Sequence, residues 1–136
     1  MANKLSHWML PVALLAAALP MGVLAADGGS AAAKQAAMAA AHAGMSLGAT
    51  DLKTAHLHLH HVVNCLVGPS GRGFDAKAGD PCKGMGQGAI VDAKGDAAME
   101  ARLHQALADA RSGLKANTLA AAHGDARQAL DILQTH

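Results

Sequence analysis

The chain has 136 residues, with 11 Lys or Arg, 10 Asp or Glu and a formal net charge of +1 at pH 7. This length excludes two ordinary domains, and the balanced charge gives no electrostatic basis for binding nucleic acid or an anionic membrane surface. With one Phe, one Trp and no Tyr, the core must be built from Ala, Leu, Val and Met, a composition that favours helices.

Residues 1–26 have the features of a cleaved secretory signal peptide. Lys4 supplies a positive charge, an apolar run follows from Trp8 to Leu24, and Val23-Leu24-Ala25 has the small-residue spacing that signal peptidase accepts. The alternative is a membrane anchor, but two prolines interrupt the run and it is short for a full span. We therefore expect an exported, soluble, periplasmic protein whose single domain is formed by residues 27–136.

Four helices are expected in this domain, because Ala and Leu dominate it and no segment alternates with the period of two that strands require. Their approximate ranges are 31–45, 51–67 (from Thr50 or Asp51), 96–111 (from Asp92 or Asp96) and 117–134. Short connections imply antiparallel neighbours. The predicted fold is an all-α, up-down-up-down four-helix bundle.

A Gly-rich loop is expected between the second and third helices, at residues 68–88, with seven glycines and two prolines. A loop of this length in a small domain is usually functional or compactly folded. Cys65 and Cys82 are the two cysteines of the chain, and in an oxidising compartment a disulfide between them is expected. The bond would staple the loop and stabilise the fold by about 3 kcal/mol on the chain-entropy model.

Histidines in the second predicted helix divide into two groups on a helical wheel. The apolar stripe of this helix consists of Leu52, Ala55, Leu59, Val62, Val63 and Leu66. His56 and His60 lie beside that stripe, whereas His58, His61 and Cys65 point the other way. We interpret the first pair as near-core residues, and His58 with His61 as a possible second, weak metal site on the surface.

The first predicted helix is almost all Ala, and its large uncharged side chains on one face are Met38, His42 and Met45. Counting residues outward from the predicted turns places one histidine of each helix in a common layer of the bundle. That layer consists of His42, His56, His104 and His123, and one turn deeper lie Met38, His60 and Met99.

Such a cluster suggests a metal site built from inward side chains on facing helices. Neutral imidazoles suit copper, zinc or nickel, and thioethers favour copper, above all Cu(I). His42, His56 and His123 are the first candidates, followed by His60, His104, Met38 and Met99. The competing interpretation is structural, because Met often fills gaps in cores and a single His on a helix usually has no ligand.

These features resemble the small exported His-rich helical metal-binding proteins of bacteria. The resemblance lies in the signal peptide, the Ala-rich helices and the spaced histidines His42, His56, His58, His60, His61, His104 and His123. It implies a buffer, store or carrier for copper or a similar ion.

Two other functions remain open. The layout is also similar to four-helix b-type cytochromes, which implies haem held by Met38 or Met45 with His123. The scarcity of aromatic residues argues against haem, and the absence of CxxCH excludes covalent attachment of the usual c type. The other alternative is a cofactor-free interaction protein. No nucleophile–base or paired-carboxylate pattern is present, so we expect that the protein is not an enzyme.

Overall fold

The computed structural model describes residues 30–135, and the predicted signal peptide lies outside this range. The described chain is all-helical, without strands. Its helices are α1 (Ala31–Gly48), α2 (Leu52–Val67), α3 (Ala89–Asp92), α4 (Ala97–Leu114) and α5 (Leu119–Gln134). The all-helical prediction is confirmed, but the described residues form five helices where four were predicted. None of these helices is long and apolar enough to cross a membrane.

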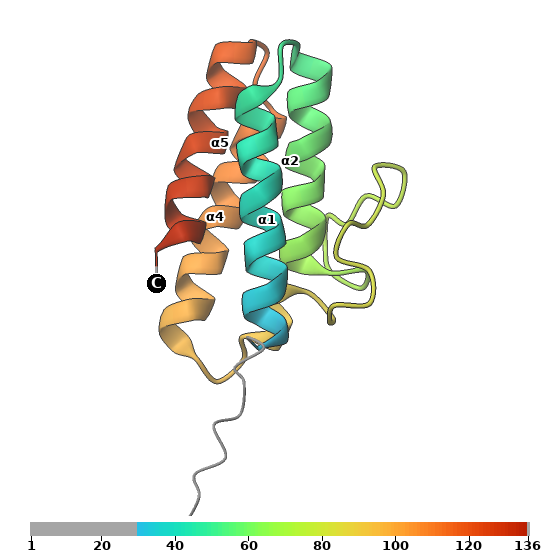
Figure 1. The fold of residues 1–136 in the computed structure, drawn as a ribbon, viewed down its shortest axis with the longest axis vertical. Coiled ribbons are helices and arrows are strands. Elements are labelled where there is room, and N and C mark those ends of the chain that lie inside the picture. Colours follow the sequence, from blue (N-terminus) through green and yellow to red (C-terminus); the bar gives the residue numbers. More distant parts are fainter. Residues whose placement is uncertain (1–29, 136) are drawn as a thin grey trace, which may run out of the picture.

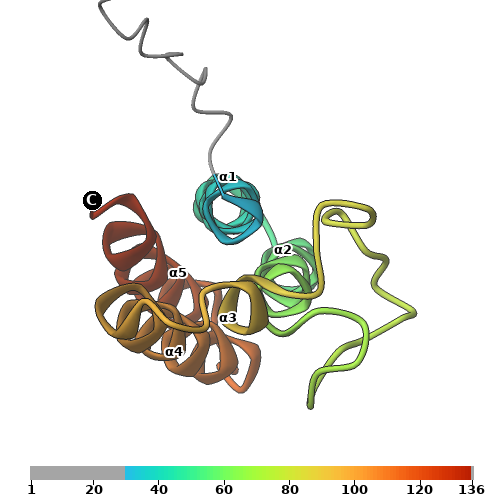
Figure 2. The ribbon, with the colours of Figure 1, turned by 90° about the horizontal axis from the view of Figure 1, so that it is seen from below.

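The four long helices lie side by side, as Figure 1 and the view from below in Figure 2 show. α1 packs against α2 and α5, and α4 packs against α5 and α2, so that each long helix contacts two others extensively. The short helix α3 contacts α1, α2 and α4 near one end of the group. This arrangement brings one face of α1 directly against α2.

Side-chain caps determine where the long helices begin. The carboxylate of Asp51 accepts a hydrogen bond from the Thr54 N–H, and that of Asp96 accepts one from the Met99 N–H, as expected for N-cap residues. Of the two predicted starts of the third long helix, Asp96 is therefore correct. The segment before it is a separate short helix, α3, because Gly95 adopts a φ of 102° that cannot continue a helix.

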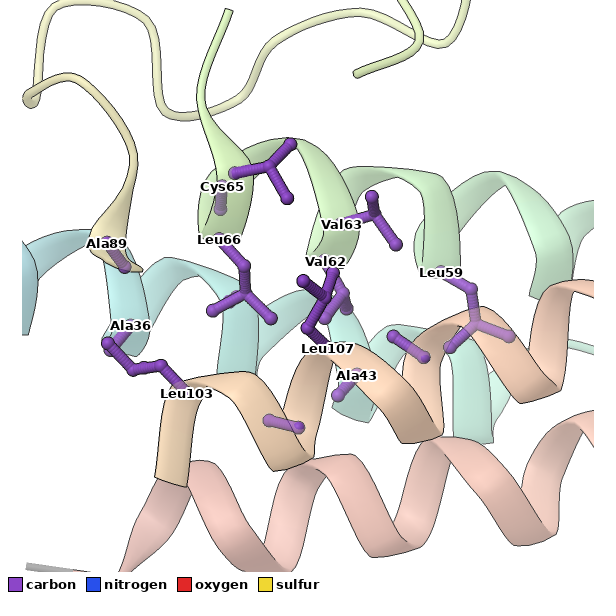
Figure 3. Close-up of a cluster of buried hydrophobic side chains, with 14 of the residues drawn as sticks. Ala36, Ala43, Leu59, Val62, Val63, Cys65, Leu66, Ala89, Leu103 and Leu107 are labelled. Atoms are coloured by element: carbon purple, nitrogen blue, oxygen red, sulfur yellow. The ribbon is translucent and has the colours of Figure 1, made fainter. Parts of the chain in front are cut away.

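The core is built mainly from Ala on α1 and from larger aliphatic residues on α2. Figure 3 shows Leu59, Val62, Val63 and Leu66 of α2 among the buried side chains. All four belong to the predicted apolar stripe. The buried residues of α1 are four alanines together with Gln35, His42 and Ser46. Since Ala side chains are small, α1 can approach α2 closely, and one buried position on this interface is a histidine.

The Gly-rich loop lies beside α2 (Figures 1 and 2), and its first part also contacts α4, where the Arg111 guanidinium donates to the Arg72 carbonyl at 2.6 Å. The predicted disulfide is present, joining Cys65 to Cys82 with a Cα–Cα distance of 5.2 Å. The buried side chain of Gln35 anchors the far end of the loop. Its Nε2 donates to the Asp92 carboxylate at 2.6 Å, and its Oε1 accepts from the Gly88 N–H at 2.9 Å. The loop is therefore attached to both α1 and α2.

Candidate metal centre

Three histidines converge where α1 meets α2. The Nδ1 atom of His42 lies 3.3 Å from Nδ1 of His58 and 3.3 Å from Nδ1 of His61. Among the described residues, this is the group of His, Cys, Asp or Glu side chains whose ligand atoms lie close enough together, all within 4.8 Å, to hold a metal ion. His42 is buried, and His58 and His61 are partly buried. The cluster could therefore hold a metal ion.

The register between α1 and α2 brings these residues together. The Ser46 hydroxyl, itself fully buried, donates a hydrogen bond to the Ala55 carbonyl at 3.1 Å. His42 lies one turn before Ser46 on α1, and His58 lies about one turn after Ala55 on α2, so these two histidines face each other. His61 follows His58 by three residues and therefore lies on the same side of α2.

A backbone carbonyl sets the tautomer of His61. Its Nε2 atom lies 2.6 Å from the carbonyl oxygen of Ala78 in the Gly-rich loop. A carbonyl can only accept a hydrogen bond, so Nε2 carries the proton, and Nδ1 of the neutral ring presents its lone pair. That lone pair points toward the His42 ring.

One proton cannot make linear hydrogen bonds to both neighbours of the His42 Nδ1 atom. If this nitrogen carries a proton, it donates to one neighbour or shares the proton between the two; if it does not, it faces the bare nitrogen of His61 in the tautomer that is protonated on Nε2. A cation would be attracted to all three nitrogens at once. Two nitrogen ligands of a tetrahedral ion with bonds of about 2.0–2.1 Å lie about 3.3–3.4 Å apart. Two of the three separations, at 3.3 Å each, match this geometry, and the ligand atoms of all three residues lie within 4.8 Å of one another.

Electrostatics keep two rings of the cluster, His42 and His58, in the ligand form. Burial lowers the pKa of His42 from 6.5 to about 4, and repulsion from charged His61 and His58 adds to this effect. Partial burial, with a smaller effect of His61, also lowers the pKa of His58. Near neutral pH both rings are therefore uncharged, which is the state that coordinates metals.

We expected His58 and His61 on an outer surface, and the structure places both of them partly buried. Their grouping on one side of α2 together with Cys65 is correct, but α1 and the Gly-rich loop cover that side. Cys65 is 0% exposed, and His61 contacts both His42 and the loop residue Ala78. A helical wheel shows which side chains share a face of one helix. It does not show which other segment of the chain packs against that face.

The structure does not bring the predicted layer of four histidines together. His123 uses its Nε2 atom in a 3.1 Å contact with the Ala49 carbonyl, at the end of α1. His104 is exposed on α4. His56 and His60 line an open groove beside Asp75, with His60 Nδ1 3.6 Å from the Asp75 carboxylate. Of the first three candidate ligands, only His42 belongs to the observed cluster.

The methionines that were candidate ligands differ in their exposure to solvent. Met38 and Met99 are partly buried and pack against the hydrophobic core, which agrees with the gap-filling role that competed with ligation. Met45 is 49% exposed. The Nε2 atom of His123, which haem would need as an axial ligand, is directed at a backbone carbonyl.

Comparisons with protein-family models, with curated proteins and with solved structures give no significant match. The function is therefore inferred from the site itself.

Proposed function

We propose that this protein is a periplasmic transition-metal-binding protein, with copper as the favoured ion, and that it acts as a buffer, store or carrier. The observation that supports the proposal is the convergence of three imidazole nitrogens, with His42 Nδ1 3.3 Å from Nδ1 of both His58 and His61. His42, His58 and His61 are the proposed ligands. A disulfide-bonded loop is consistent with an oxidising compartment.

Copper is favoured by the chemistry of the donors. All three are imidazoles, which suit copper, zinc and nickel, and among divalent ions copper binds nitrogen sites most tightly. Met38 lies one turn before His42 on α1, and Met45 lies three residues after it. A thioether or a water molecule would complete four-fold coordination, and a thioether would favour Cu(I). Zinc and nickel are the next choices.

The test is elemental analysis of the untagged protein after dialysis, for the wild type and two triple variants. In the first variant, His42, His58 and His61 are replaced by Gln. In the control, His56, His60 and His104 are replaced by Gln, so that the same number of imidazoles is lost. We expect about one equivalent of copper in the wild type and in the control, and none in the first variant.

Three outcomes would contradict the proposal. If the wild type retains no metal after loading with copper or zinc, the clustered histidines are structural and the cofactor-free interpretation gains support. If the control variant loses its metal and the first variant keeps it, the ion binds elsewhere. Stoichiometric iron with a strong visible absorption band would instead support the haem alternative.

A further inference from the structure

One buried amide side chain attaches the Gly-rich loop to α2 next to the cluster. Asn64 is 0% exposed. Its Nδ2 donates to the carbonyls of Asp75 at 2.8 Å and Gly79 at 2.6 Å, and its Oδ1 accepts from the Asp75 N–H at 2.8 Å. Asn64 thus holds both ends of the segment 75–79.

Ala78, which contacts His61, lies between these two ends. The segment is a tight turn in which the Ala78 N–H donates to the Asp75 carbonyl at 3.2 Å. Gly79 closes it with a φ of 94°, which favours glycine. The Ala78 carbonyl is thereby directed at His61 Nε2, 2.6 Å away. Asn64 lies three residues after His61 on α2, so one stretch of helix supplies both the proposed ligand and the anchor of its partner.

We propose that Asn64 is a positioning residue of the metal site, which docks the turn 75–79 so that the Ala78 carbonyl holds His61 in the tautomer that presents Nδ1 to the metal. This inference rests on the proposed function. It assigns a role to the Gly-rich loop, which forms the outer wall of the site and fixes the orientation of one ligand. Partners of this kind typically change metal affinity by about 10- to 100-fold.

The coupling between docking of the loop and metal binding is reciprocal. If docking of the loop favours metal binding, metal binding must favour docking of the loop by the same factor. Zinc should therefore slow hydrogen exchange of the backbone amides of Lys77, Ala78 and Gly79, which form hydrogen bonds within the turn.

The experiment compares Asn64→Ala with Gln35→Ala. Gln35 is a matched control, because it is also a buried amide, 1% exposed, that anchors this loop, but at the end near Gly88 and away from His61. Zinc affinity is measured by competition with a chelating dye. The tautomer of His61 in the metal-free protein is measured by long-range ¹H–¹⁵N NMR.

We expect Asn64→Ala to lower zinc affinity by about 10- to 100-fold and to give His61 a mixture of tautomers. Gln35→Ala should leave both the zinc affinity and the tautomer nearly unchanged, because Gln35 does not hold the turn 75–79. The proposal is overturned if both variants lower affinity equally, since a general loss of stability would then suffice. It is also overturned if the tautomer changes and affinity does not.

If Asn64→Ala does not fold, hydrogen exchange of the wild-type protein tests the proposal instead. Slower exchange of the three turn amides on addition of zinc supports the proposal, and unchanged exchange with zinc bound overturns it. A wild type that binds neither zinc nor copper overturns the proposed function instead. In that case the tautomer of His61 still reports whether the loop positions this ring.

Discussion

His42 of α1 and His58 of α2 place their Nδ1 atoms 3.3 Å apart across the interface between the two helices. The same His42 atom lies 3.3 Å from Nδ1 of His61, so one nitrogen of α1 faces two nitrogens of α2. A metal ion bound there would add a direct link between α1, whose buried side chains are mainly Ala, and α2. Metal binding should therefore stabilise the fold as well as fill the site.

The first prediction concerns thermal stability. With free zinc at about 100 times its dissociation constant, the native state should gain about 2.7 kcal/mol, which raises the Tm of a domain this small by on the order of 10 °C. Differential scanning calorimetry with zinc and then with excess EDTA checks this gain and its reversal. The variant lacking His42, His58 and His61 should show no rise, and an equal rise in that variant would mean that zinc stabilises the protein from another site.

The second prediction concerns the metal-free protein in acid. The pKa of His42 is about 4 in the folded protein and 6.5 ordinarily, so the unfolded chain takes up a proton first as the pH falls. Stability from the neutral ring is therefore present above about pH 6.5 and lost as the pH decreases to about 4. Urea unfolding at pH 7 and pH 4.5 should show a larger loss of unfolding free energy in the wild type than in His42→Leu. Equal losses would show that His42 titrates normally.

The fold was largely predictable because it depends on local features of the sequence. Asp51 and Asp96 are good N-caps, and both begin helices. The spacing of the apolar residues of α2 predicts its buried stripe, and the two cysteines of this short chain predict the disulfide. The short helix α3 was missed because four residues carry too little periodicity to be recognised.

The site was predictable only in part, because ligands from different segments meet through packing. His42 was recognised as the polar residue on an Ala-rich face. A helical wheel predicts an outward direction for His58 and His61, because it cannot show that the Gly-rich loop folds back over α2. Asn64, which lies between the apolar residue Val63 and Cys65, could have indicated that the loop covers this side of α2. A buried amide needs hydrogen-bond partners, and here the loop supplies them.

The third prediction separates His123 from the metal site. Its Nε2 atom lies 3.1 Å from the Ala49 carbonyl and so links α5 to the end of α1. His123→Ala should lower the free energy of unfolding by about 1 kcal/mol, the typical contribution of one hydrogen bond, without changing zinc affinity. Chemical denaturation and zinc titration of the same variant check both parts. A tenfold loss of zinc affinity would restore the ligand role that the sequence suggested.

The fourth prediction concerns the disulfide. Cys65 and Cys82 are buried, 0% and 4% exposed, and their bond spans 17 residues of the chain. Replacing both by Ala should lower the free energy of unfolding by about 3 kcal/mol, because the unfolded chain gains freedom when the loop is opened.

Urea unfolding of the wild type and of this double variant, each with and without a reducing agent, tests the effect. The reducing agent should shift the wild type toward the variant and leave the variant unchanged. Because Asn64 and Gln35 hold the loop independently of the sulfur atoms, the double variant should still bind zinc. Complete loss of binding in a folded double variant would mean that the disulfide, rather than Asn64, holds the Ala78 carbonyl against His61.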